Sequence, residues 1–122
     1  YRHVDLSKIS GREAEKEINT TDEAIKKITG HETEFIRPPF GAMPEGEEDP
    51  DKIYVKWTVD SLDWVTKDTE KIVEKVTADT KEGDVILMHD CYGESVEAAL
   101  QIVDIMEKQG YEFVTADELI IN

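Results

Sequence analysis

The chain has 122 residues, enough for one domain with a hydrophobic core but few for a complete α/β enzyme. Its 29 acidic residues outnumber 14 basic ones and give a formal net charge of −15, which repels nucleic-acid phosphates and anionic lipid surfaces. No apolar run approaches the ~18 residues of a membrane-spanning helix. A single cysteine, Cys91, excludes an internal disulfide. We therefore expect no nucleic-acid partner and no membrane span.

The first residues of the chain show no periodic pattern of apolar residues, and a helical pattern follows them. Residues 1–6, Y-R-H-V-D-L, show no helical or alternating period, and we expect them to continue a segment that lies upstream. Ser10 and Glu13 then have the spacing of a capping box, and Gly30 supplies a stop. Between them, residues recur at 4-3-4-3 spacing on one helical face: Ala14, Ile18, Thr21, Ile25 and Ile28.

A short strand and a rigid turn follow this helix. The apolar pair Phe35–Ile36 predicts a strand, and the two prolines of the segment R-P-P-F-G, residues 37–41, end its ladder and fix the turn. Residues 42–52 are acidic, contain Gly and Pro, and show no period, which indicates a solvated loop. A calcium site is the less favoured alternative for this loop, because its acids lack the alternating spacing of an EF-hand loop.

The strongest strand pattern is Ile53–Val59. Its near-continuous run of β-branched and aromatic residues suits a strand covered on both faces of a parallel sheet. The strand leads into a polar turn that carries Asp60, Asp63 and Trp64. In parallel sheets and barrels the ligand binds at the carboxyl ends of the strands. We therefore expect these side chains at the rim of a site, not in the core.

The remainder of the chain alternates helices and strands. The first predicted element is a helix capped by Thr66 or Asp68, with a buried stripe of Ile72, Val73 and Val76. A strand over Val85–Met88 follows, and then a helix capped by Ser95 and closed by Gly110. The last predicted elements are a strand over Tyr111–Val114 and a helix over Ala116–Ile120. The residues expected on the buried face of the helix after Ser95 are Val96, Ala99, Leu100, Val103 and Met106. This order predicts an α/β layer or barrel fold.

Polar residues recur just past the predicted strand ends: Arg37, Asp60, Asp63 and His89. One rim would then present a guanidinium group, two carboxylates and an imidazole. Each residue also has a structural interpretation. Arg37 can be an ion-pair partner of a loop, Asp60 a turn or cap residue, and His89 a satisfied structural histidine. Trp64 alone would be no argument, since a rim tryptophan is as often a packing residue as a platform for a sugar.

Three segments in this order carry a resemblance to a known family: R-P-P-F-G at residues 37–41, D-S-L-D-W at 60–64 and L-M-H at 87–89. They resemble the third, fourth and fifth motifs of the polysaccharide deacetylase family, the NodB homology domain of carbohydrate esterase family 4. The segment that ends at His3 is similar to the end of the second motif, H-(S/T)-x-x-H. The resemblance covers the chain from His3 to Leu119.

The resemblance implies a fold and a domain organisation. The fold class is α/β, the C-terminal part of a distorted (β/α) barrel, with the N-terminal strands missing from this chain. Residues 1–122 would form a single partial deacetylase domain that starts inside the second metal-binding motif. The first motif, T-F-D-D-G, which supplies the catalytic base and a metal-binding aspartate, is absent, and so is the first metal-binding histidine. The acidic loop 42–52 stands where the family usually has a helix, so the substrate groove there should differ.

The chemistry of the family requires a hydroxide near neutral pH, which a divalent cation with an open coordination position provides from bound water. The resemblance implies that His3 is one of three metal ligands. It favours zinc, with cobalt, nickel or manganese as alternatives. Since one histidine cannot form a three-ligand site, we expect the isolated chain to bind zinc weakly and to be inactive.

The resemblance also implies roles for the rim residues. His89 would protonate the leaving amine, with Asp63 as the neighbouring carboxylate that favours the imidazolium form and Asp60 as the fallback. Arg37 would orient the missing aspartate base through a charge-assisted pair, and the backbone N–H at Phe40 would help to hold the tetrahedral oxyanion. The residues expected to bind substrate are Phe40, Asp60, Trp64 and Leu87.

Two classes of function remain open at this point. The first is a metal-dependent deacetylase of an N-acetylated or O-acetylated polysaccharide, with peptidoglycan or a chitin-like polymer of N-acetylglucosamine favoured, acting outside a bacterial cell or in its envelope. The second is a non-catalytic carbohydrate-binding relative or an inactive remnant. An acetylated polysaccharide is the expected substrate. The expected partner is the missing N-terminal segment of the same domain, whether cleaved from this chain or supplied as a separate chain.

Overall fold

The computed structural model describes residues 1–46, 49 and 51–121. The chain divides into two compact units, an N-terminal unit, Tyr1–Lys56, and a C-terminal unit, Trp57–Asn122. No described helix is both long enough and apolar enough to cross a membrane. Of the acidic loop 42–52, Glu47 and Glu48 lie outside the described residues.

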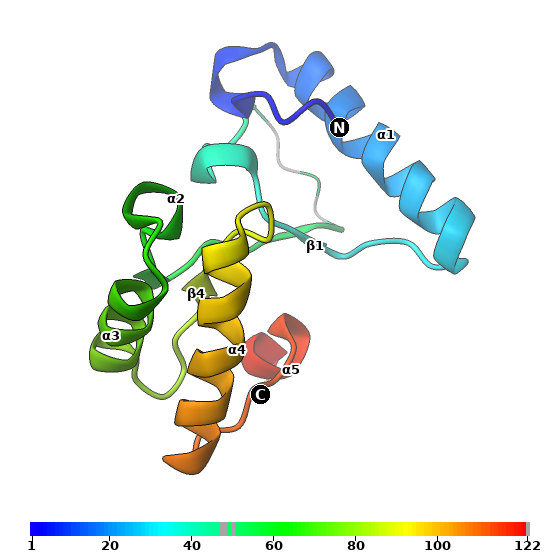
Figure 1. Ribbon diagram of the computed structural model, residues 1–122. Helices are drawn as coiled ribbons and strands as arrows, with labels where there is room; N and C mark the ends of the chain where they lie inside the picture. The colour runs from blue at the N-terminus through cyan, green and yellow to red at the C-terminus, as the bar shows by residue number, and fades with distance from the viewer. Residues whose placement is uncertain (47–48, 50, 122) are drawn as a thin grey trace. The chain divides into compact units, whose positions relative to one another are not determined.

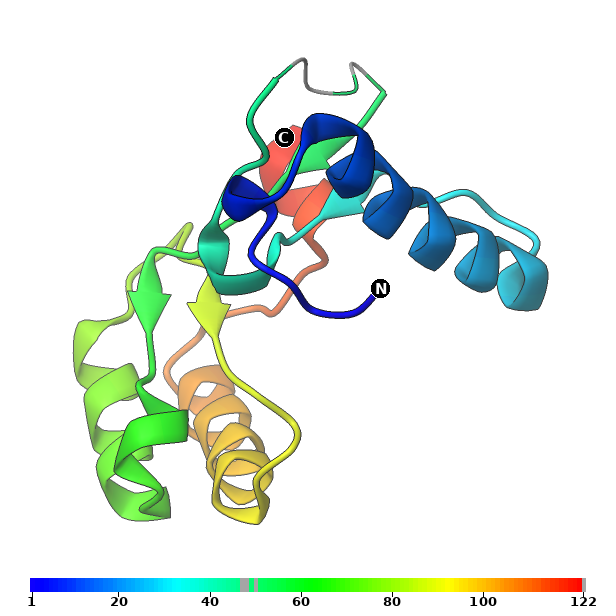
Figure 2. The same cartoon turned by 90° about the horizontal axis from the view of Figure 1, so that it is seen from above.

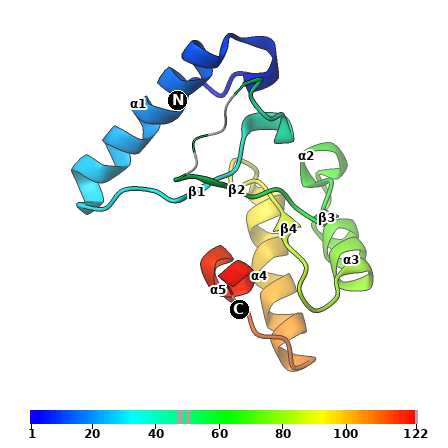
Figure 3. The same cartoon turned by 180° about the vertical axis from the view of Figure 1, so that it is seen from behind.

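The main helix of the N-terminal unit is α1 (Gly11–Thr29), visible in Figure 3. The predicted capping box is confirmed, because Glu13 N–H donates to Ser10 Oγ at 3.3 Å and Ser10 N–H donates to Glu13 Oε2 at 3.1 Å. The helix ends at Gly30, whose φ of 80° is the left-handed conformation that glycine adopts without strain. The predicted face is buried only near its start, since Ala14 is buried whereas Ile28 is 86% exposed.

The strands of the N-terminal unit form a two-stranded parallel ladder (Figure 3). Strand β1 (Phe35–Ile36) pairs with β2 (Ile53–Tyr54), with Phe35 opposite Ile53. The prolines end β1 as predicted, and a 3₁₀ turn over Pro39–Gly41 follows. A half-buried ion pair ties α1 to the start of β2, because Lys52 Nζ lies 2.6 Å from Asp22 Oδ2.

The C-terminal unit contains a second parallel ladder with helices packed beside it (Figures 1 and 2). Strand β3 (Val59–Asp60) pairs with β4 (Ile86–Leu87), with Asp60 opposite Leu87. The helices of this unit are α2 (Asp63–Thr66), α3 (Thr69–Asp79), α4 (Gly93–Lys108) and α5 (Ala116–Ile121). Helix α3 begins at the predicted cap Asp68, whose carboxylate accepts from Lys71 N–H at 3.1 Å.

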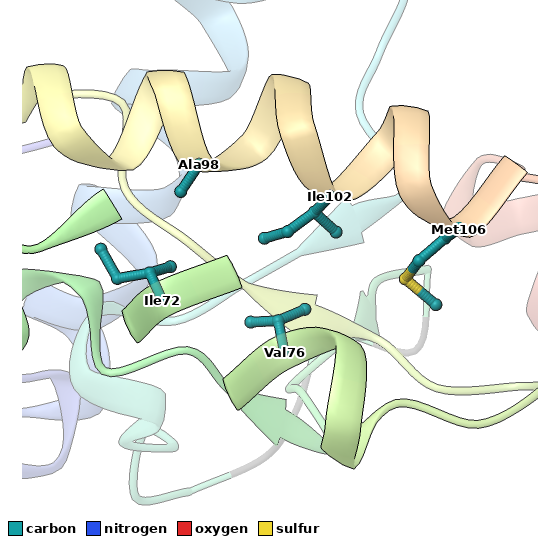
Figure 4. Close-up of a cluster of buried hydrophobic side chains, with 5 residues drawn as sticks. All are labelled: Ile72, Val76, Ala98, Ile102 and Met106. Atoms are coloured by element: carbon teal, nitrogen blue, oxygen red, sulfur yellow. The ribbon is translucent and has the colours of Figure 1, made fainter. Parts of the chain in front are cut away.

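The hydrophobic core of the C-terminal unit lies between α3 and α4. In Figure 4, the side chains of the two helices point toward one another. The members of this cluster, none more than 2% exposed, are Ile72, Val76, Ala98, Ile102 and Met106. Burial of aliphatic side chains of this size stabilises a fold by about 1.5–3 kcal/mol each. Ile86 of β4 packs against this cluster, so the core also holds the ladder that Asp63 and His89 follow.

Two predicted strands are wrong in extent. The run Ile53–Val59 is not one continuous strand, because its ends belong to separate ladders, β2 and β3. The predicted strand Tyr111–Val114 has no ladder with any described strand. Phe113 and Val114 are 44% and 46% exposed, so these residues have β propensity without a neighbouring strand to pair with.

Two predictions for α4 are also wrong. Ser95 does not cap this helix, which begins at Gly93 after Tyr92, and Ser95 is instead 1% exposed inside its first turn. The predicted buried face is correct for Met106, which is 2% exposed, but it is otherwise rotated, since Val96, Leu100 and Val103 are 44%, 66% and 38% exposed. Helix α4 carries apolar residues on two neighbouring faces, and the face that contacts α3 is the one that contains Ile102.

Candidate functional site

The turn after β3 places Asp63 in the interior of the C-terminal unit. Leu62 adopts a left-handed φ of 54°, which turns the chain from the strand into α2, and Asp63 is the first residue of that helix. Ser61 is fully buried and its Oγ accepts from Asp63 N–H at 3.3 Å. Asp60 has a local role in this turn, since its Oδ1 accepts from Leu62 N–H at 2.9 Å.

Asp63 and His89 form a close pair, as the sequence analysis expects. Asp63 Oδ1 lies 2.7 Å from His89 Nδ1, and Asp63 Oδ2 accepts from the His89 backbone N–H at 2.7 Å. The Trp64 backbone N–H also donates to Oδ1, at 2.9 Å. Because a carboxylate accepts hydrogen bonds, we assign the ring hydrogen to His89 Nδ1. The nitrogen left to exchange protons with another group is therefore Nε2.

The two side chains of this pair differ in exposure. The Asp63 side chain is 0% exposed, whereas that of His89 is 35% exposed. A buried carboxylate beside a half-exposed imidazole is the arrangement in which a fixed negative charge orients a titrating ring. The pair can therefore transfer a proton to or from a ligand at the surface of the unit while its carboxylate stays out of water.

Several groups set the ionisation of Asp63. Burial raises the pKa of its carboxyl, but hydrogen bonds from the His89 ring, from Ser95 and from the His89 backbone outweigh burial and lower that pKa below the usual range. The buried Ser95 Oγ itself makes no hydrogen bond of ordinary geometry with a described residue. Asp63 is consequently ionised at neutral pH.

Three further predicted site residues lie in the N-terminal unit. The His3 ring meets the Phe40 ring edge-on, with centroids 5.0 Å apart and planes at 74°. Both residues adopt left-handed backbone conformations, with φ of 57° and 59°. Phe40 is 67% exposed, and Arg37 is exposed as well. His3 and Arg37 both line a hollow of about 320 Å³, whose apolar wall includes Ile18, Ile25 and Phe35.

The remaining predicted residues lie at the carboxyl ends of β3 and β4. Trp64 is on α2 and 50% exposed, which leaves one side of its indole open to a ligand. Leu87 is 6% exposed within β4, where it lies opposite Asp60. The structure thus brings together Asp63 and His89 in one unit, and His3 and Phe40 in the other. The Asp60 side chain accepts its hydrogen bond from the Leu62 backbone and not from His89.

A metal ion is not accommodated by the described residues alone. No group of three or more His, Cys, Asp or Glu residues in that part of the chain is arranged to hold one. His3 offers one imidazole, which belongs to no group of three such residues in the described N-terminal unit. The described side chains can therefore contribute at most one part of a metal site.

Two buried serines of this unit, Ser61 and Ser95, are not foreseen from the sequence as buried residues near Asp63. Nothing in the sequence pattern singles out Ser61, and Ser95 is expected at a helix cap because serine favours that position. A signal is present for Ser95, which is three residues before Ala98 and seven before Ile102 and therefore shares their face of α4. A serine on a buried helix face needs a polar neighbour.

Comparison with known proteins gives the family. The polysaccharide deacetylase family model matches residues 1–53. The chain is 36% identical over 98% of its length to the peptidoglycan-N-acetylmuramic acid deacetylase PdaC of Bacillus subtilis, and 33% identical over 98% to the peptidoglycan-N-acetylglucosamine deacetylase PgdA of Listeria monocytogenes. The chain belongs to the polysaccharide deacetylase family. It spans about a quarter of those two proteins, 26% of each.

The solved structures agree with this family. The structure of peptidoglycan deacetylase PdaC from Bacillus subtilis matches 98% of the chain with a TM-score of 0.93 and 34% identity, and the chain covers 59% of that structure. The predicted fold class is confirmed: the chain has the α/β fold of a C-terminal portion of the deacetylase (β/α) barrel. Its extent as a single partial domain over residues 1–122 stays a prediction.

Proposed function

We propose that this chain is the C-terminal portion of a metal-dependent peptidoglycan deacetylase that removes the N-acetyl group from an amino sugar of the polymer. The observation that carries the proposal is the buried Asp63 carboxylate, which contacts both the ring Nδ1 and the backbone N–H of His89 at 2.7 Å. The names of PdaC and PgdA state deacetylation of N-acetylmuramic acid and N-acetylglucosamine in peptidoglycan. A chitin-like polymer is the alternative substrate.

His89 acts in this proposal as the general acid. Deacetylation breaks the bond between the carbonyl carbon and the sugar nitrogen after hydroxide adds to that carbon. The nitrogen must gain a proton to leave as an amine, and acetate is the other product. His89 Nε2 donates this proton, while Asp63 holds Nδ1–H and favours the imidazolium that donates. Asp63 keeps its own charge throughout, since its pKa lies below the usual range.

Other residues bind and orient in this proposal. Arg37 orients the aspartate base that the family's first motif supplies, and the Phe40 backbone N–H donates to the oxyanion. The indole of Trp64 and the side chain of Leu87 line the site for the sugar face and the acetyl methyl group, and Asp60 shapes the rim. A divalent metal ion, zinc first and cobalt, nickel or manganese otherwise, supplies the hydroxide when bound, with His3 as one ligand beside ligands outside the described residues.

The proposal places the protein at the bacterial cell envelope or outside the cell, where peptidoglycan is accessible. Its expected partners are the polysaccharide and the N-terminal part of the same domain, which completes the site. The net charge of −15 argues against nucleic acid and against an anionic membrane surface as partners, because both repel a negatively charged protein.

The test is acetate release from peptidoglycan and from chitin oligomers by the natural protein that contains these residues, measured with each of the four metals. We expect activity, and a fall in kcat by about 10²–10⁴ in His89→Ala, the usual consequence of losing general acid–base catalysis. His31→Ala is the matched control, because His31 is exposed in the loop after α1. Absence of release with all four metals, combined with retained sugar binding, would support the carbohydrate-binding alternative instead.

A further inference from the structure

One carboxylate of α1 differs from its neighbours on the same helix. Glu17 is 6% exposed, whereas Glu13, Glu15 and Glu23 are exposed. A charged side chain is rarely buried unless it is paired, because removal from water is costly for the ionised form. Glu17 must therefore be compensated by donors that the fold brings to it.

Those donors come from the segment that precedes His3. The Arg2 backbone N–H donates to Glu17 Oε2 at 2.7 Å, and Arg2 Nε donates to Oε1 at 2.6 Å. Figures 1 and 3 show the N-terminal segment beside α1. These contacts, led by the Arg2 backbone N–H and then its side chain, lower the pKa of Glu17 to about 2 in spite of its burial.

The residue after this contact has an unusual backbone. His3 has a φ of 57°, a left-handed conformation that non-glycine residues seldom adopt and that persists where the surroundings enforce it. Its ring is fixed from the other side by the edge-on contact with Phe40, 5.0 Å between centroids. The Glu17 carboxylate thus holds the backbone and the side chain of Arg2, the residue directly before His3.

We propose that Glu17 is a positioning residue: its carboxylate holds Arg2 at both its backbone and its guanidinium, and thereby fixes the backbone and the ring orientation of His3. The purpose of that orientation rests on the proposed function, in which the His3 imidazole is a ligand of the catalytic cation. The positioning itself is a property of the N-terminal unit and needs no bound metal.

The test uses the imidazole proton signals of His3, His31 and His89 in the natural protein that contains these residues, prepared free of metal, with each signal assigned by its loss on substitution of that histidine. Phe40→Leu removes the neighbouring ring and calibrates how far the His3 signals move when its ring-current shift is lost. In Glu17→Gln we expect the His3 signals to move by more than half of that displacement, while those of His31 and His89 stay in place. The new amide still offers one acceptor, but its –NH₂ group opposes an Arg2 donor. Glu15→Gln, which removes a charge from the same helix at an exposed position, should move none of them.

Arg2→Ala provides a second variant in case Glu17→Gln does not fold. It keeps the backbone N–H and loses the guanidinium, so the His3 displacement should be smaller than in Glu17→Gln. The proposal is overturned if His3 signals stay in place in both variants, or if all three histidines move together, which indicates a general loss of stability. The outcome is independent of catalysis: an inactive natural protein would overturn the proposed function and leave the positioning result standing.

Discussion

The two units of the chain are held together by different forces. The C-terminal unit buries an apolar cluster between α3 and α4, with no member more than 2% exposed. In the described N-terminal unit, the buried apolar side chains are Leu6, Ala14 and Pro38, and charged contacts supplement them. The chief ones are Glu17 with Arg2 and Lys52 with Asp22. Packing therefore dominates in one unit, and ion pairs have a larger share in the other.

This difference bears on the candidate site residues of each unit. Asp63 and His89 are presented by elements that rest on a hydrophobic core, whose packing pH and salt affect little. His3, Arg37 and Phe40 lie outside the α-helices and strands of the N-terminal unit, in which the carboxylates of Glu17 and Asp22 form ion pairs. We expect mutation of the core to disturb the first group, and acid to disturb the second.

The largest expected effect is on catalysis and distinguishes the two carboxylates after β3. In the natural protein, Asp63→Asn should lower kcat by about 10²–10⁴, because a neutral amide no longer stabilises the imidazolium of His89. The measurement is kcat for acetate release at saturating substrate.

Asp60→Asn is the control for this prediction. The Asp60 side chain accepts from the Leu62 backbone N–H at 2.9 Å, and an asparagine oxygen can accept the same bond. The variant should therefore change stability slightly and leave kcat close to that of the unmodified protein. If Asp60→Asn lowers kcat and Asp63→Asn does not, the two carboxylates are assigned the wrong way round. If neither variant lowers kcat, the pairing with His89 has no catalytic role.

The next expected effect is on stability and compares two apolar residues of α4. Ile102 is 2% exposed and packs against α3, whereas Leu100 is 66% exposed. Ile102→Ala should lower the free energy of unfolding of the C-terminal unit by about 2–5 kcal/mol through lost burial and a residual cavity. Leu100→Ala should change it by no more than about 0.5 kcal/mol. Tryptophan fluorescence in urea isolates this unit, because Trp57 and Trp64 both belong to it. Equal losses in the two variants would mean that another element covers Leu100.

The same helix shows where sequence reasoning reached its limit. Val96, Leu100 and Val103 form an apolar stripe, and so do Ala98 and Ile102 with Met106. Periodicity locates a helix and its apolar residues, but it cannot choose between two adjacent apolar faces, since the choice depends on the partner surface. For Tyr111–Val114, likewise, propensity predicts a strand that lacks a neighbour among the described strands.

The strand-end residues were more predictable. The carboxyl ends of parallel strands meet at one edge of a sheet, so Asp63 and His89 could be expected close together from their places after β3 and β4. Glu17 could not be foreseen in the same way. It is one of several acids on α1, and its partner Arg2 lies 15 residues earlier in a stretch without a period. Only the folded arrangement shows which of the acids is buried.

The smallest expected effect concerns acid and the N-terminal unit. The pKa of Glu17 is about 2 in the folded chain, against an ordinary value of 4.5. A carboxyl whose pKa is lowered by folding contributes stability above its unfolded pKa and loses that contribution as the pH falls through its folded pKa. The protection of α1 amides against hydrogen exchange should therefore decrease as the pH falls from 4.5 toward about 2.

In Glu17→Gln the protection of the α1 amides should already be lower at pH 4.5, and its further decrease with falling pH should be smaller. Some decrease should remain, because the pKa of Glu13 in the capping box is also lowered. Glu15→Gln should keep the pH dependence of the unmodified chain. A decrease of equal size with and without the Glu17 carboxylate would show that the acid sensitivity of this unit arises from other groups.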